Sequence, residues 1–358
     1  MILSEMAYAT LEALQAGSSI RDIKDATADE LHPHLDDELP GLSSLLHEFN
    51  APRRDQVSVE IASRLQDTLP QCAHRQPNKM TIFCGSGHVS ICWNDLHDPS
   101  ILQSLRDYYD VSHDIDAHST IGHLCITRNN DGSYSVVASP DVSDLHSSQE
   151  NTAACFVEVS RAITELACNY PAHMAVLHAA TLVRDDQVLI LINPSGSGKT
   201  TLAWLLTTIG YALVHDDCLP VRPNGDLVQV LTPSILKEGS WNVLEQSGLQ
   251  IQNDEFTRLG RQVRYQAITR LKEWPAGKGR RFLFVHYVPN ATSSLTPVSP
   301  LETFRRIVCE EAVIPRHRPE RLAGLFDWIT STDSAELRYS DFRDAARLID
   351  DWISHGKD

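Results

Sequence analysis

The segment LINPSGSGKTTL, residues 191–202, constrains the fold of this 358-residue chain more than any other stretch. An apolar run, Val188–Ile192, leads into it and predicts a buried strand, and the end of the segment with the residues that follow predicts a helix over 200–209. A glycine-rich turn between a strand and a helix is typical of a phosphate-binding loop, where backbone N–H groups and the helix N-terminus surround phosphate oxygens. The sequence therefore predicts an α/β core built around a nucleotide site.

The loop keeps the end of the Walker A pattern G-x-x-x-x-G-K-[ST] but changes its beginning. Asn193 stands at the position of the first glycine, and Pro194 follows it. Because the residue before a proline favours extended backbone, we expect the loop entry to differ from that of the commonest P-loop. The alternative is a glycine–serine turn that only happens to precede Lys-Thr. We expect nucleotide contacts from Pro194, Ser195, Gly196, Ser197, Gly198, Lys199, Thr200 and Thr201.

Two acids follow the next predicted strand. Asp216 and Asp217 come after the apolar run Tyr211–Val214 and His215. A strand that ends in a carboxylate beside a P-loop holds Mg²⁺ in nucleotide-dependent enzymes, and a second carboxylate can accept a proton from an attacking hydroxyl. The alternative is a solvated acid pair at a strand end. The distance from the loop, natural for a βαβ unit, favours the catalytic interpretation.

His178 lies within the apolar run Ala175–Val183, which predicts another buried strand. Taken alone, a histidine in an apolar strand is more often a core residue than a functional one. The residue gains a functional interpretation only together with the loop and the two acids.

These three elements together resemble the core of the HPr kinase/phosphorylase family. That family has a histidine in a strand, a second strand, a GxSGxGK[ST] loop, a helix, and a strand that ends in Asp-Asp. Here His178 precedes Asn193 by 15 residues and Asp216 follows Thr200 by 16. Residues 175–220 carry the resemblance, and a looser similarity extends from about 80 to 355. The block looks closest to the HPr-kinase-like proteins of biosynthetic operons, including lasso-peptide kinases, which phosphorylate a serine hydroxyl on a precursor peptide.

The resemblance implies a P-loop serine kinase that uses ATP and Mg²⁺, with an HPr-kinase/PEP-carboxykinase-like fold. Asp216 would be the general base, and His178 would sit beside it and orient it. Asp217 and Thr200 would serve Mg²⁺, while Lys199 and the loop amides would hold the nucleotide phosphates. The implied partner is a hydroxyl-bearing acceptor, a serine of a peptide or protein, and relatives of this kind often form homo-oligomers.

Two other functions remain open from the residues alone. A small-molecule hydroxyl kinase would use the same side chains on a free alcohol, sugar or serine. A nucleotide-gated adaptor would bind ATP through the same loop to drive assembly, without phosphotransfer.

The chain divides into three predicted parts: a helical segment with a linker over 1–75, a small α+β domain over 76–170, and the kinase domain over 171–358. Within the first part, LSEMAYATLEALQAGSSIRDI resembles the helical part of PqqD-like domains, which bind leader segments of precursor peptides. A plain helical hairpin packed on the kinase is the alternative.

Patterns in the other two parts predict further elements. Two β-rich runs, MTIFCGSGHVSICW and HLCITRNNDGSYSVVAS, predict hairpins, and helices are expected over 99–109 and 150–170. Later strands are expected over 227–231 and 282–288, with closing helices over 301–312, 318–332 and 340–355.

Charge and composition exclude several classes. The net charge of -16 argues against a nucleic-acid surface as the main partner, and no apolar run is long enough to cross a membrane. Eight scattered cysteines without a C-x-x-C pair predict reduced thiols in a cytoplasmic protein. Residues 256–281 form a basic island in this acidic chain. The island is either a solvated face or an electropositive rim for phosphates or an acidic substrate.

Overall fold

The computed structural model describes residues 78–85, 87–94, 99–112, 120–139, 149–168, 173–271, 279–308, 312–313 and 319–355. The predicted helical segment over 1–75, with its PqqD-like stretch, lies outside these residues. Within them the chain is a mixed α/β protein of the α+β kind, with four sheets and seven helices.

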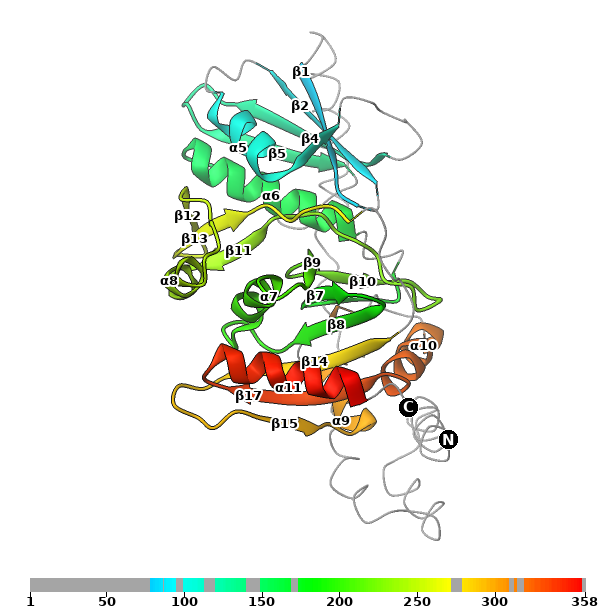
Figure 1. Ribbon diagram of the computed structural model, residues 1–358. Helices are drawn as coiled ribbons and strands as arrows, with labels where there is room; N and C mark the ends of the chain where they lie inside the picture. The colour runs from blue at the N-terminus through cyan, green and yellow to red at the C-terminus, as the bar shows by residue number, and fades with distance from the viewer. Residues whose placement is uncertain are drawn as a thin grey trace.

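The front unit is a five-stranded sheet with two helices on one face (Figure 1). Its elements are β1 (Asn78–Phe83), β2 (His88–Asn94), α5 (Ser100–Tyr108), β3 (Asp110–Ser112), β4 (Thr120–Arg128), β5 (Tyr134–Ser139) and α6 (Thr152–Cys168). The strand order is β3-β1-β2-β4-β5, and the pairs β1–β2 and β4–β5 are antiparallel. Both predicted hairpins are therefore confirmed.

The main sheet has six strands in the order β15-β17-β14-β8-β7-β9. They are β7 (Ala179–Arg184), β8 (Gln187–Ile192), β9 (Ala212–His215), β14 (Arg280–Tyr287), β15 (Ser294–Pro297) and β17 (Asp333–Tyr339). Strands β8, β14 and β17 are parallel, while β7 is antiparallel to both of its neighbours, β8 and β9. Strands β8 and β9 therefore run in the same direction, and the segments that follow them emerge at the same edge of the sheet.

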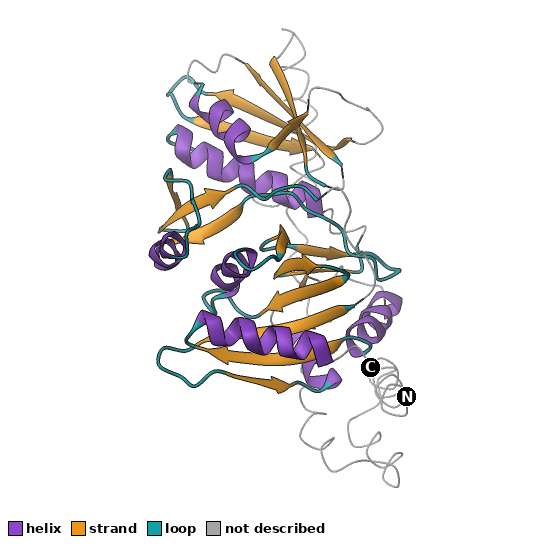
Figure 2. Cartoon of the chain, in the orientation of Figure 1, coloured by secondary structure: helices purple, strands orange, loops and turns teal. Residues whose placement is uncertain are grey.

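Helices cover both faces of the main sheet, and the period-two pattern of its strands decides which residues face which helices (Figure 2). On one face, Ile190 and Phe282 share a core with α9 (Pro300–Arg306) and α10 (Pro319–Thr330). On the other, Leu191 and Leu283 share a core with α7 (Lys199–Thr207) and α11 (Phe342–His355). Central strands buried on both faces explain why the sequence around the loop reads as continuous apolar runs.

A three-stranded sheet, β11-β13-β12, lies between the front unit and the main sheet (Figure 1). It contains β11 (Ser234–Lys237), β12 (Glu255–Arg258) and β13 (Arg261–Gln266), and α8 (Glu238–Gln246) follows β11. Phe256 and Tyr265 of this sheet pack on Phe156 of α6. The ring centroid of Phe156 lies 4.8 Å from that of Phe256 and 5.0 Å from that of Tyr265. The hydrophobic core of the front unit therefore includes residues that come much later in the chain.

Two sequence predictions about strands are wrong in detail. The expected strand over 227–231 is reduced to isolated bridges, because Leu227 pairs with Val221 whereas Val230 pairs with Gly85 of the front unit. The expected strand over 175–183 is split into β6 (Ala175–Leu177) and β7, which belong to different sheets. Strand β6 pairs with β10 (Leu219–Val221) and β16 (Ala312–Val313), so His178 lies at the break between two sheets.

Two general expectations concern the membrane and the cysteines. In the ranges that the structure describes, no helix is both long enough and apolar enough to cross a membrane. The cysteines in these ranges, Cys84, Cys92, Cys125, Cys155, Cys168 and Cys218, are free thiols.

The turn between β1 and β2 is wedged against the segment after β10, and this contact yields a stability prediction. Gly85 has φ +87°, and a Cβ there would lie 2.3 Å from the carbonyl oxygen of Gln229. Gly210 has a similar φ of +98°, but a Cβ there would meet nothing within 4 Å. We expect Gly85→Ala to lower the free energy of unfolding by about 2 kcal/mol or more, and Gly210→Ala by about 1 kcal/mol. Urea unfolding of the two variants measures the difference, and equal losses would contradict a steric role for Gly85.

Candidate functional site

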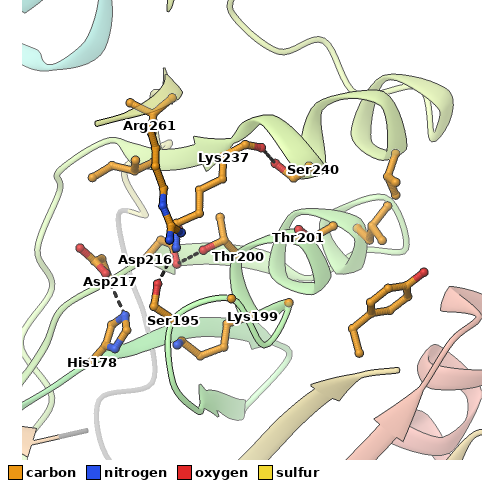
Figure 3. Close-up of a pocket in the computed structure, with 18 of the residues that line it drawn as sticks. His178, Ser195, Lys199, Thr200, Thr201, Asp216, Asp217, Lys237, Ser240 and Arg261 are labelled. Carbon is orange, nitrogen blue, oxygen red and sulfur yellow. Dashed lines mark hydrogen bonds and ion pairs between the residues drawn. The ribbon is translucent and has the colours of Figure 1, made fainter. Parts of the chain in front are cut away.

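A cleft of about 900 Å³ opens between the loop after β8 and the β11-β13-β12 sheet with α8. Figure 3 shows most of the residues that line it. The predicted site residues in its lining are His178, Ser195, Gly196, Gly198, Lys199, Thr200, Thr201, Asp216 and Asp217. Pro194 and Ser197 are the predicted residues that the lining does not include. The shared direction of β8 and β9 explains why the loop and the acid pair meet here.

The loop has the backbone geometry of an anion site. Gly196 and Gly198 have φ of +95° and +99°, and a Cβ on Gly196 would point into open space. Helix α7 begins directly after Gly198, and no side chain of the N-cap residue accepts a hydrogen bond from its first turn. The loop is also held to β14, because Tyr287 N donates to Ser197 O over 3.0 Å. Such a loop is ready to accept phosphate oxygens.

Asn193 gives the loop entry a contact that a glycine cannot make. Its side chain is buried, and Nδ2 donates a hydrogen bond of 2.9 Å to the carbonyl oxygen of Val285 in β14. Asn193 is not among the described residues with positive φ, so the position does not use the left-handed backbone that a glycine would permit. The entry to the loop is therefore anchored to the neighbouring strand by a side chain.

Two lysines approach the loop from different elements. Lys199 is buried, and its Nζ donates to the backbone oxygens of Asn193 and, over 3.4 Å, of Pro194. Lys237, at the end of β11, donates from its Nζ to Ser195 Oγ across the cleft (Figure 3). Sequence reasoning missed Lys237, because it is a single lysine outside any motif and only the packing of β11 brings it to the loop.

Asp216 is the buried member of the acid pair. It is only 3% exposed, and Thr200 Oγ1 donates to its Oδ1 over 3.2 Å. Burial, with the neighbouring charge of Asp217 as the second cause, raises the pKa of Asp216 to about 6. The carboxyl group therefore sits where ionisation is costly unless a cation is close.

Asp217 is the accessible member. Its side chain is 41% exposed, and its Oδ1 lies 3.0 Å from His178 Nε2. Burial raises the pKa of Asp217, but the hydrogen bond and charge of His178, with the charges of Arg258 and Lys199, outweigh it, and the pKa is lowered overall. Asp217 adopts φ +79°, an uncommon backbone region for a residue other than glycine.

The structure distributes the partners of the two acids differently from the sequence-based expectation. We expected His178 beside Asp216, but the ion pair of His178 is with Asp217, while Asp216 accepts from Thr200 (Figure 3). The physical reason lies in the backbone after β9. The positive φ at Asp217 turns its side chain towards the break between β6 and β7, where His178 lies.

The Thr200–Asp216 pair has the donor chemistry that suits Mg²⁺. Both groups offer oxygen atoms, which hard cations prefer. In the described part of the chain no three His, Cys, Asp or Glu side chains form a metal-binding group. At nucleotide sites Mg²⁺ often takes one or two protein ligands and fills its remaining positions with phosphate oxygens and water, so the Thr200 and Asp216 oxygens could hold it.

The basic island divides into two groups. Arg258 and Arg261 flank the tip of the β12–β13 hairpin and line the cleft. Arg264 instead pairs with Glu245 and Glu255. Arg270 pairs with Asp110, and Arg281 bonds to Gln187. The island therefore has features of both alternatives: Arg258 and Arg261 place positive charge at the cleft, and Arg264 and Arg270 pair with acids elsewhere. Lys272 and Lys278 lie outside the described residues.

Comparisons with known proteins add no family assignment. No protein-family model matches the chain, and no curated protein matches it significantly. The functional argument therefore rests on the geometry of the cleft.

The buried carboxyl of Asp216 predicts a pH-dependent gain in stability for Asp216→Asn. The folded-state pKa is raised from 3.8 to about 6, so the cost of ionising Asp216 in the folded chain is absent below pH 3.8 and complete above about pH 6. We expect the nucleotide-free variant to be more stable than the wild type by up to about 3 kcal/mol at pH 7.5, with the gain shrinking as the pH falls towards 4. Thermal unfolding at a series of pH values tests this, and a gain that does not depend on pH would contradict it.

Proposed function

We propose that this protein is a Mg-ATP-dependent kinase that transfers the γ-phosphoryl group to a serine-type hydroxyl of a peptide or protein. The observation that carries the proposal is the convergence of the anion-binding loop, the Thr200–Asp216 pair and the His178–Asp217 pair in one cleft. A nucleotide-gated adaptor needs the loop and a metal group. An adaptor does not need a second, accessible carboxylate that a histidine holds in place. The His178–Asp217 pair therefore favours phosphotransfer.

The geometry supports an exchange of the two roles that the resemblance implied for the acids. Asp216 is buried against Thr200 and suits the metal, whereas Asp217 is accessible and suits the acceptor hydroxyl. His178 would hold the Asp217 carboxylate in place through their 3.0 Å contact. The lowered pKa keeps Asp217 ionised at neutral pH. In a loose phosphoryl-transfer transition state, the acceptor hydroxyl loses its proton only after the bond to the leaving group has largely broken. A weak base such as an ionised carboxylate is therefore sufficient.

In the proposed reaction the acceptor oxygen forms a bond to the γ-phosphorus. The bond from that phosphorus to the β–γ bridging oxygen breaks, and ADP leaves. The hydroxyl proton passes to Asp217 and then to solvent. Lys199 would exchange its contacts with the Asn193 and Pro194 carbonyl groups for phosphate oxygens, and Lys237 would add a second positive charge from across the loop. Thr200 and Asp216 would hold Mg²⁺, which would supply positive charge beside the phosphates.

The proposal predicts different losses for the two acids. We expect Asp217→Asn to bind Mg-ATP like the wild type but to transfer phosphate at least about 100-fold more slowly, because only the proton acceptor is removed. Asp216→Asn is expected to weaken Mg²⁺-dependent ATP binding itself. The measurement uses the full chain with radiolabelled ATP and the protein and peptide fraction of its host cells, followed by phosphoamino-acid analysis for phosphoserine.

Asp226→Asn provides the matched control, since Asp226 bonds to Asn224 and is not part of the cleft lining. Tight ATP binding by the wild type without any labelled acceptor would contradict the kinase proposal and support the adaptor.

A second candidate function rests on a smaller chamber of about 250 Å³ that adjoins the cleft. Asp217, Ile235 and Arg258 line both spaces, and the wall of the chamber includes Ser160 and Thr164 of α6. A chamber of this size, open to the accessible acid, suits a small hydroxyl compound better than a folded protein surface. The chain would then be a small-molecule hydroxyl kinase with the same catalytic residues.

The two candidate acceptors predict opposite effects of filling the chamber. For a small acceptor, Thr164→Leu should lower phosphotransfer to the metabolite fraction of host cells roughly tenfold while ATP binding stays unchanged, because the side chain occupies the chamber. Mass spectrometry of that fraction after incubation with ATP detects a phosphorylated product. Label that appears only in the protein and peptide fraction, unaffected by the substitution, would exclude this candidate.

A further inference from the structure

Exposed apolar side chains concentrate in the cleft. Among the described residues, the large apolar side chains that remain exposed are Ile209, Val243, Leu259, Tyr287 and Val313. Three of them, Val243, Leu259 and Tyr287, line the same cleft. Exposed apolar surface gathered in one concave site indicates a ligand with an apolar part, which phosphates alone do not provide.

Tyr287 is the aromatic member of this group, and it adjoins the phosphate loop directly. It is the last residue of β14, and its backbone N–H is the group that donates to Ser197 O. A Cβ on Gly198 would lie 3.1 Å from the Cβ of Tyr287, so the ring begins beside the last glycine of the loop. We expect the ribose and base of a nucleotide whose phosphates bind this loop to lie in the cleft that Tyr287 also lines.

The ring of Tyr287 is held in place on one side and accessible on the other. It packs against the buried ring of Tyr339, with centroids 5.6 Å apart and an interplanar angle of 68°. Val288 N donates to Tyr339 O over 2.8 Å, so the backbones that carry the two rings are joined as well. Tyr287 is nevertheless 52% exposed. A fixed aromatic ring with an accessible face is a stacking platform that needs little reorganisation to bind a flat ligand.

We propose that Tyr287 is the platform on which the purine base of the nucleotide stacks. The inference rests on the proposed function, since it assumes that the loop holds a nucleotide. Leu259 is a poorer candidate, because it is aliphatic, 93% exposed, and at the tip of a hairpin on the other wall of the cleft. The cleft then has two halves: the loop and the lysines take the triphosphate, and Tyr287 with its apolar neighbours takes the base.

Stacking also sets which bases bind well. The hydroxyls of Ser240 and Ser340 line the cleft, but each already donates to a backbone oxygen, of Lys237 and Ala291 respectively. We expect the area of the stacked ring to contribute to recognition, and a purine offers more area than a pyrimidine. We expect the wild type to bind ATP more tightly than CTP.

The test compares Mg-ATP, Mg-CTP and Mg-tripolyphosphate, which has no base, by titration calorimetry on the full chain. We expect Tyr287→Ala to lower ATP affinity roughly tenfold, to leave tripolyphosphate affinity within about twofold, and to abolish the preference for ATP over CTP. Tyr287→Phe keeps the ring and should bind ATP within about threefold of the wild type. Ile209→Ala, at an exposed apolar residue that is not part of the cleft lining, is the matched control and should not change ATP affinity.

Tyr287→Leu is the second variant, in case Tyr287→Ala does not fold, because leucine keeps apolar volume without a flat ring. We expect it to show the same selective loss of ATP affinity. Wild-type ATP affinity in both Tyr287→Ala and Tyr287→Leu would overturn the platform and leave the kinase proposal standing. An equal loss for ATP and tripolyphosphate would also overturn it, because Tyr287 would then act on the loop. A wild type that binds none of the three ligands would overturn the kinase proposal and the platform together.

Discussion

The shared direction of β8 and β9 is the constraint on which the rest of the site depends. Strand β7 lies between them, antiparallel to both, so the chain leaves β8 and β9 at the same edge of the sheet. The loop with Lys199 therefore meets Asp216 and Asp217, although the helix α7 separates them in the sequence. Any other strand direction would place the acids at the opposite edge, and no local feature of the loop could compensate.

The cleft also places two carboxyl groups next to each other, and their repulsion lowers the stability of the folded state when both are ionised. Asp216 is buried next to Asp217, and its raised pKa reports the free energy needed to keep it ionised. Lys199 and Lys237 converge on the loop from the other side, in a chain whose net charge is -16. In the proposed complex, a bound Mg-nucleotide would add counter-charges to both groups. Proteins often keep such unfavourable arrangements at functional sites, because the same charges stabilise the ligand.

The wall of the cleft opposite the loop comes from the part of the fold that was hardest to predict. Strands β11, β12 and β13 are short and carry charged residues at their ends, so the sequence shows no clear strand pattern there. They are stabilised by long-range contacts, chiefly Phe256 and Tyr265 on Phe156 of the front unit. The strands on either side of the loop were predictable, because their apolar runs and the glycine-rich turn are local signals.

The sequence by itself determined the chemistry that is available: a loop with two glycines, a lysine and a threonine, followed by a strand that ends in two acids. Residue types and local backbone preferences decide these features. The tertiary structure decided which groups meet. It paired His178 with Asp217, brought Lys237 to the loop, anchored Asn193 to β14, and left Tyr287 half exposed. Each of these contacts joins residues from separate elements, and strand pairing and backbone turns such as the positive φ at Asp217 set their geometry.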